Sequence, residues 1–220
     1  APAGVPRALA GTTATFVPDD RAALDAAIVE RGDRLAAVVM EPMRHHDPAP
    51  GYLEHVRSAA HAAGALLVFD EITVGWRTCF GGAHRRLAVD PDLALFAKCM
   101  SNGFPMAAVI GRAEAMEGAH GSFISSTYWT ESIGPVAALA TLEKMECTGA
   151  AAQVNATGRR IAALWRAQGE AAGLPIEIAD GCPALVHFTW QHEEADALRT
   201  LFTQLMLGCG FLAGAAVYCT

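Results

Sequence analysis

Short apolar runs alternate with amphipathic segments over the first half of the chain. Four runs have the length of strands and occupy residues 35–40, 65–69, 93–96 and 106–110. Runs that are apolar throughout are typical of strands covered on both faces. Residues 19–31 and 52–63 instead carry apolar positions at helical spacing, and Gly64 is a helix stop. This alternation predicts a parallel or mostly parallel sheet with helices on both faces.

The pattern changes beyond residue 130. Small and apolar residues dominate residues 131–145, which predicts a long, largely buried helix. Residues 150–172 follow with apolar positions on a helical period and end at Gly173-Leu174-Pro175. We therefore expect two consecutive long helices.

The pattern of the last part of the chain indicates a separate structural unit. Two short strand-like runs precede an amphipathic helical stretch, at residues 176–179, 184–189 and 193–207. The loss of regular strand–helix alternation predicts a second domain that begins near Ala150. No internal repeat or low-complexity tract is present.

An acid and a lysine stand where two of the predicted strands end. Asp70 closes the run 65–69, and Lys98 follows the run 93–96. An α/β sheet presents groups to ligands at the carboxyl ends of its strands. A pyridoxal 5′-phosphate (PLP) enzyme uses this pair, because a lysine amine forms the Schiff base and a carboxylate keeps the pyridine nitrogen protonated. From the residues alone, Asp70 could instead cap the following turn, and Lys98 could extend from the surface.

Composition and charge exclude several classes of protein. The 220 residues are 52% hydrophobic and 18% charged, which is typical of a globular protein rather than a disordered one. A net charge of −7 without a basic run argues against a nucleic-acid partner. No apolar stretch reaches the roughly 18 residues of a membrane span. The N-terminus lacks the pattern of a signal peptide, so we expect no membrane partner.

The positions of the cysteines indicate free thiols rather than a disulfide framework. Six are scattered along the chain, without a Cys-x-x-Cys pair or a partner histidine at metal-ligand spacing. We expect a cytoplasmic protein that holds no metal.

The order and spacing of several motifs together carry a family resemblance. They are Val38-Val39-Met40-Glu41-Pro42, Pro50-Gly51-Tyr52-Leu53, Phe69-Asp70-Glu71-Ile72-Thr73-Val74-Gly75-Trp76-Arg77, Gly81-Gly82, Pro91-Asp92-Leu93, Lys98, Asn102-Gly103-Phe104-Pro105 and Gly111-Arg112. In these motifs the chain resembles the class III (subgroup II) PLP-dependent aminotransferases, and within them the glutamate-1-semialdehyde aminomutase-like branch. The likeness is strong over residues 35–145 and looser elsewhere.

The resemblance implies a fold, an activity and an assembly. The fold is the aspartate aminotransferase-like fold type I of PLP-dependent transferases, a mostly parallel sheet with flanking helices plus part of a smaller C-terminal α+β domain. Residues 1–149 would belong to the large PLP-binding domain, and residues 150–220 would begin the small domain. The implied activity moves an amino group between a small-molecule amino donor and a keto or aldehyde acceptor. A homodimer with shared active sites is implied as well.

The resemblance also assigns the site residue by residue. Lys98 becomes the Schiff-base lysine and the base that moves the substrate proton, and Asp70 takes the pyridinium nitrogen. Ile72 packs on the cofactor ring, on the same face as Asp70 if the strand continues. Thr127 corresponds to the threonine that binds the cofactor phosphate of the neighbouring subunit, and Glu41 lies on the substrate side.

Plainer interpretations of some of these residues stay open. Ile72 could be ordinary core, and Glu41 could anchor the loop before Pro42. Glu71 and Arg77 read as residues that hold the loop after the strand.

The Thr127 segment departs from the family pattern. Ser126-Thr127-Tyr128-Trp129-Thr130 stands where the family has Gly-Thr-Leu-Ser-Gly. Two aromatic residues there would reshape the substrate entrance, so the aminomutase substrate does not follow from the resemblance.

The chain is short for this family and lacks its upstream glycine/serine-rich phosphate loop. It therefore resembles an internal fragment of a longer enzyme, and two alternatives to an aminotransferase stay open. One is an aminomutase of the glutamate-1-semialdehyde type, which transfers the amino group within one substrate. The other is an incomplete, non-catalytic chain, because the missing loop would supply backbone donors for the phosphate.

Overall fold

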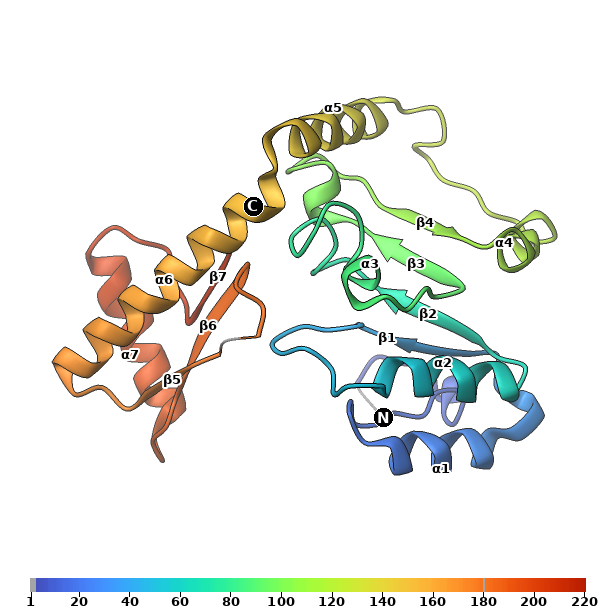
Figure 1. Ribbon diagram of the computed structural model, residues 1–220, viewed down its shortest axis with the longest axis horizontal. Helices are drawn as coiled ribbons and strands as arrows, with labels where there is room; N and C mark the ends of the chain where they lie inside the picture. The colour runs from blue at the N-terminus through green and yellow to red at the C-terminus, as the bar shows by residue number, and fades with distance from the viewer. Residues whose placement is uncertain (1–2, 180) are drawn as a thin grey trace.

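The first sheet forms the central layer of the larger part of the molecule (Figure 1). The computed structural model describes residues 3–179 and 181–220. The strands of this sheet, in spatial order, are β1 (Ala37–Met40), β2 (Leu66–Asp70), β3 (Leu93–Phe96) and β4 (Ala108–Gly111). The helices around it are α1 (Arg21–Arg31), α2 (Tyr52–Ala62), α3 (Ala83–Leu87), α4 (Ala113–His120) and α5 (Ile133–Thr148). Single 3-10 turns occupy Arg7–Leu9, Gly32–Arg34 and Lys98–Met100.

Three strands run in one direction and the fourth runs back. β1, β2 and β3 pair in parallel, and β4 pairs antiparallel to β3. The carboxyl ends of the three parallel strands therefore lie at one edge of the sheet, and β4 starts from that same edge. This confirms the prediction of a mostly parallel sheet.

The core of this part lies between α2 and the first two strands. Tyr52 and Val56 of α2 are fully buried and share a cluster with Leu67 and Phe69 of β2. Leu24 of α1 extends the same cluster. These residues belong to the apolar positions at helical spacing and to the continuous strand runs, so the sequence pattern accounts for this layer.

A second sheet forms the other part of the molecule (Figure 1). It contains β5 (Ile176–Ile178), β6 (Leu185–Trp190) and β7 (Ala216–Tyr218), paired antiparallel in that order, with α6 (Ala150–Ala172) and α7 (Ala195–Gly208) beside β6. Gly149, with φ of 62°, turns the chain between α5 and α6. Gly158 brings α6 against the segment before β6, because a Cβ there would lie 1.6 Å from the Pro183 carbonyl oxygen.

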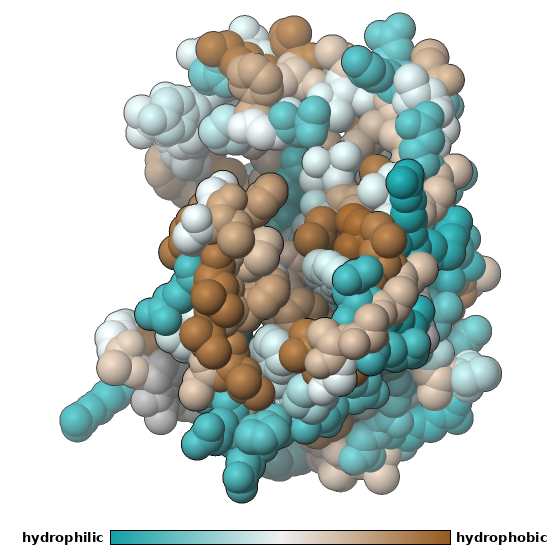
Figure 2. Space-filling model, turned by 90° about the vertical axis from the view of Figure 1, so that its left-hand side faces the viewer, coloured by the Kyte–Doolittle hydropathy of each residue, from teal (hydrophilic) through white to brown (hydrophobic). Residues whose placement is uncertain are grey.

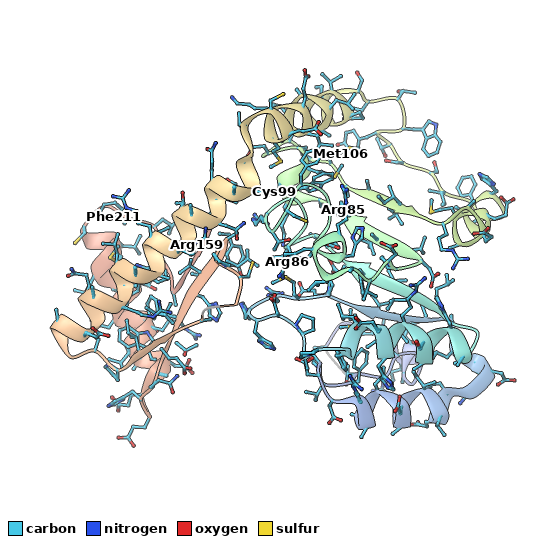
Figure 3. All side chains as sticks on the ribbon, viewed as in Figure 1. Arg85, Arg86, Cys99, Met106, Arg159 and Phe211 are labelled. Atoms are coloured by element: carbon cyan, nitrogen blue, oxygen red, sulfur yellow. The ribbon has the colours of Figure 1, made fainter. Side chains whose placement is uncertain are left out.

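The two sheets share a small core and several polar contacts. Met43, Val74 and Ala83 pack in one buried cluster with Cys182, Ala184 and Leu185. Arg86 of α3, which is labelled in Figure 3, binds both carboxylate oxygens of Asp47 and the Met43 sulfur, which fixes the loop after β1.

The structure differs from the sequence-based expectations at α5. Only Gly134 and Ala138 of this helix are buried, whereas Ile133, Val136 and Leu139 are 62%, 62% and 71% exposed. The prediction of a largely buried helix is therefore wrong for the single chain. The apolar residues of the helix are spread around it and are not confined to one face, but the chain covers only the side that packs near β3 and Met100.

Three short elements were not expected from the pattern, namely α3, α4 and β7. Each has eight residues or fewer, which is too few for a hydrophobic period to stand out. No helix within the described residues is long and apolar enough to span a membrane. The face that carries the second sheet shows bands of hydrophobic surface (Figure 2).

Candidate active site

The structure brings Asp70 and Lys98 to one edge of the first sheet. Asp70 is the last residue of β2, and its Cα pairs with that of Leu95 in β3. Lys98 follows three residues later, directly after the end of β3. An acid and a primary amine thus stand beyond the carboxyl ends of neighbouring parallel strands, where α/β sheets bind ligands.

Lys98 is exposed and is held in an uncommon backbone conformation. Its φ of 49° lies in the left-handed region, which strains a residue with a Cβ. The side chain borders a cleft of about 510 Å³ that Cys99, Phe104 and Met106 also line. Cys99 and Met106 lie near one another above β3 and β4 (Figure 3).

The thiol beside Lys98 does not compete with the amine. Burial raises the pKa of Cys99, although the charges of Arg77 and Lys98 lower it in part. The thiol therefore stays protonated near neutral pH and is a poor nucleophile. Of these two side chains, that of Lys98 is exposed and that of Cys99 is buried.

The backbone at Lys98 gives a stability prediction with an internal control. The chain has only two lysines, Lys98 and Lys144. Because glycine adopts a positive φ without strain, we expect Lys98→Gly to be more stable than Lys98→Ala by about 1 kcal/mol. Lys144 lies in α5, so there we expect the reverse order, with glycine less stable than alanine by about 1 kcal/mol.

Urea denaturation of these four variants checks the prediction. The sign of the glycine–alanine difference should change between the two positions. The same sign at both positions would contradict a left-handed conformation at Lys98.

Asp70 presents one free carboxylate oxygen. Its Oδ1 accepts a hydrogen bond from the Ile72 amide at 3.0 Å, and within the described residues Oδ2 has no hydrogen-bond partner. The side chain is half-buried. Oδ1 of Asp70 thus stabilises the turn after β2, and Oδ2 can accept a hydrogen bond from a ligand.

Ile72 lies beyond the end of strand β2. β2 ends at Asp70, and the hydrogen bond from the Ile72 amide to the Asp70 carboxylate bends the chain into a turn. The condition under which Ile72 would share a strand face with Asp70, that the strand continues, is therefore not met. Ile72 is half-buried two residues beyond Asp70 in this turn.

The turn of residues 71–77 is tightly fixed. The buried Glu71 carboxylate accepts hydrogen bonds from the Ala83 and His84 amides and contacts the His84 ring at 2.7 Å, which caps α3. The guanidinium of the buried Arg77 donates to the Thr73 carbonyl, and it also donates to the Cys219 carbonyl at 3.0 Å. The interpretation of Glu71 and Arg77 as structural residues agrees with these contacts.

Sequence reasoning missed one residue of this site, Thr73. The Lys98 Nζ donates a hydrogen bond to the Thr73 Oγ1 at 2.8 Å, and Thr73 is 4% exposed. A hydroxyl three residues after a strand-end acid was the signal available in the sequence. The turn that carries Thr73 toward Lys98 was not readable there.

The structure does not bring Glu41 and Thr127 into the Lys98 cleft. Glu41 follows β1, accepts hydrogen bonds from Arg44 at 3.0 and 3.2 Å, and borders a separate cavity of about 500 Å³. Thr127 lies in an exposed segment before α5. Neither residue is among those that line the cleft of Lys98.

Comparisons with known proteins show the family to which the chain belongs. The family model described as "Aminotransferase class-III" matches residues 14–173. The chain is 35% identical over 208 residues to the 3-aminobutyryl-CoA aminotransferase of Cloacimonas acidaminovorans, covering 91% of this chain and 50% of the relative. It is 38% identical over 144 residues to the glutamate-1-semialdehyde 2,1-aminomutase of Symbiobacterium thermophilum, covering 64% of this chain and 31% of the relative.

A solved structure supports the fold. The PLP internal aldimine form of the FumI protein from Sphingopyxis sp. MTA144 is similar with a TM-score of 0.85 and 24% identity, over 94% of this chain and 52% of that chain. The chain thus spans about half the length, or less, of the proteins it matches here. The predicted fold class is confirmed.

Proposed function

The chain belongs to the class-III aminotransferase family, and on that premise we propose that the protein is a PLP-dependent aminotransferase. It moves an amino group between an amino donor and a keto or aldehyde acceptor. The observation that carries the proposal is that Asp70, with one unbonded carboxylate oxygen, and the Lys98 amine both lie at the same edge of a fold type I sheet, at the carboxyl ends of neighbouring strands. The family and the fold confirm the resemblance found in the sequence.

The chemistry of these groups fits PLP. When bound, PLP supplies an aldehyde that takes up amines and a cationic ring that stabilises negative charge at the substrate carbon. Lys98 would hold the aldehyde end, since it is an accessible primary amine in an open cleft. The unbonded oxygen of Asp70 would accept a hydrogen bond from the protonated ring nitrogen, and its negative charge favours the protonated ring. Ile72 would contact the ring face.

The chain's own residues also account for a proton transfer. Once its amine is free, Lys98 can take a proton from the substrate carbon through its lone pair and deliver it to a second carbon atom nearby. Its anchorage after β3 and its contact with Thr73 keep the amine near one position. Glu41 would act on the substrate side from the end of the neighbouring strand β1.

We also propose that two copies of the chain form a homodimer with shared sites. Large apolar side chains are exposed along α5 and the segment before it, namely Phe123, Ile124, Tyr128, Trp129, Ile133, Val136 and Leu139. Exposed apolar patches of this kind are typical of protein interfaces. Thr127 lies within this segment, so its hydroxyl is available to a phosphate bound by the partner copy.

The domain division and the location follow the same reasoning. We assign residues 1–149 to the large PLP-binding domain and residues 150–220 to the start of the small domain, a division supported by the turn at Gly149 and the separate second sheet. The six cysteines are free, which supports a reducing compartment and hence the cytoplasm.

An aminomutase is the second candidate, favoured by the relative from Symbiobacterium thermophilum. The two activities differ in their products. Incubation of the loaded protein with an amino donor alone releases the donor's carbonyl product from an aminotransferase. An aminomutase would instead return an isomer of its substrate.

Borohydride fixation tests the proposed function directly. We expect purified protein mixed with one equivalent of PLP and reduced with borohydride to gain the cofactor's mass on the peptide that contains Lys98. Lys144, which is exposed on α5, serves as the internal control. Peptide mass spectrometry gives the ratio of modification at the two lysines.

Two results would argue against the proposal. Equal modification of Lys98 and Lys144 would mean that PLP reacts with any accessible amine. No modification would favour the non-catalytic alternative, in which this chain does not hold the cofactor.

A further inference from the structure

The Lys98 amine has a partner that the proposed chemistry does not require. Its Nζ donates to the Thr73 Oγ1 at 2.8 Å, and the contact joins the turn after β2 to the turn after β3. Lys98 is exposed whereas Thr73 is 4% exposed. The flexible Lys98 side chain thus donates its hydrogen bond to the hydroxyl of a buried residue.

The hydroxyl is fixed because its residue is fixed. Thr73 is β-branched, which restricts its side-chain rotamers. Its carbonyl accepts a hydrogen bond from Arg77, whose guanidinium also binds the Cys219 carbonyl beside β7. The Asn155 side chain of α6 donates to the Arg77 carbonyl at 2.7 Å. The second sheet and its helix therefore hold the turn that carries Thr73.

The same turn has no room to shift toward β3. A Cβ at Gly75 would lie 2.6 Å from the Glu71 carbonyl oxygen and 2.8 Å from the Phe96 ring. The Gly75 amide also donates to the Glu71 carbonyl at 2.8 Å. The hydroxyl thus occupies one place relative to the end of β3, from which Lys98 extends.

We propose that Thr73 is a positioning residue for Lys98, an inference that rests on the proposed function. A neutral amine has two N–H groups and one lone pair. When one N–H is bound to the Thr73 Oγ1, the lone pair must point elsewhere, and of these two residues only Lys98 lines the open cleft. Thr73 therefore directs the lone pair that takes the substrate proton. No bond other than the hydrogen bond changes at Thr73.

The chain offers a conservative variant and a matched control. Thr73→Val removes the hydroxyl and keeps the shape, and Thr73→Ser keeps the hydroxyl. Thr78→Val makes the same change in the same loop, at a hydroxyl that is buried without a hydrogen-bond partner among the described residues. Urea denaturation measures the free energy of unfolding of each variant separately.

The first measurement uses cofactor-free protein. Trace acetylation with acetic anhydride, followed by peptide mass spectrometry, gives the labelling of Lys98 relative to Lys144. We expect Thr73→Val to raise this ratio roughly two- to tenfold, the factor that corresponds to one typical hydrogen bond, because the amine no longer breaks that bond to react. Thr73→Ser and Thr78→Val should leave the ratio unchanged.

The second measurement uses PLP-loaded protein. We expect Thr73→Val to lower kcat by about 10- to 100-fold, since small misplacements of a reacting group have effects of this size. KM should change little, and the isotope effect with an α-deuterated amino donor should increase because proton transfer becomes slower. Thr73→Ser, which keeps the hydroxyl, should have the kcat and the isotope effect of the wild type.

The outcomes separate the two proposals. If Thr73→Val behaves like Thr78→Val in either the labelling ratio or kcat, the positioning role of Thr73 is overturned, even though borohydride still fixes PLP on wild-type Lys98. If borohydride does not fix PLP on wild-type Lys98, the proposed function itself fails, and the role of Thr73 falls with it.

Discussion

Replacing Lys98 by alanine will lower the rate of amino transfer by roughly 10⁴-fold or more, because the substitution removes the covalent anchor and the base together. The side chain is exposed and its only contact with a hydrogen-bonding group in the described structure is the one with Thr73. The loss of activity should therefore occur in a folded protein. The measurement is the steady-state rate with an amino donor and a carbonyl acceptor.

Lys144→Ala is the matched control, since it removes the other lysine of the chain from an exposed position on α5. We expect its activity to equal that of the wild type. Addition of a small primary amine such as ethylamine should restore part of the activity of Lys98→Ala and none in the control. Full activity of Lys98→Ala would refute the assignment of this lysine.

Replacing Asp92 by alanine will have the largest effect on stability, a loss of about 3 kcal/mol in the free energy of unfolding. The Asp92 side chain is 4% exposed. Its carboxylate accepts hydrogen bonds from the Leu67 amide at 2.7 Å, from the His61 ring at 2.8 Å and from Arg112 at 2.9 Å. The Asp92 amide donates back to the Leu67 carbonyl at 2.8 Å.

Most of this loss would come from the Leu67 amide. That group is buried at the start of β2 and would keep no partner, whereas His61 and Arg112 are 36% and 55% exposed and can turn to water. Asp92→Asn keeps an acceptor for the amide, so we expect a smaller loss. Asp90→Ala, at an exposed position nearby, should change stability by no more than about 0.5 kcal/mol.

The same carboxylate gives the protein an acid-sensitive contribution. Burial alone would raise the pKa of Asp92, but the hydrogen bonds of Leu67 and His61, the charge of His61 and the hydrogen bond of Arg112 together lower it. Because the pKa of Asp92 is lower in the folded state than in the unfolded state, the ionised carboxylate stabilises the fold. This stabilisation is fully present above the unfolded-state pKa of about 3.9 and is lost as the pH falls through the lower, folded-state pKa. Urea denaturation between about pH 7 and pH 3 should therefore show a steeper loss of stability for the wild type than for Asp92→Asn.

The sequence was most informative where local signals mark both ends of an element. The helix predicted over 150–172 is the observed one, because Gly149 and Gly173 both adopt the left-handed conformation that ends a helix. The strand predicted over 93–96 is also the observed one. Asp70 and Lys98 were found for the same reason, since each directly follows a short apolar run.

Contacts between distant residues could not be read in this way. α3 has five residues and begins where the carboxylate of Glu71, 12 residues earlier, caps it. The contact of Thr73 with Lys98 depends on the register of β2 and β3, to which Asp92 and Leu67 contribute. The exposure of α5 depends on what covers it, which a hydrophobic period does not encode.

The reversed direction of β4 has a consequence for the order of folding. β3 and β4 are separated only by residues 97–107, whereas residues 41–65 and 71–92 separate the parallel pairs. Shorter loops lose less entropy on closure, and local contacts form faster than distant ones. The strand pair that carries Lys98 can therefore form first, and Asp70 joins it only when β2 docks. The acid and the amine are therefore brought together by the pairing of two strands that are distant in the sequence, and not by the local pair that carries the amine.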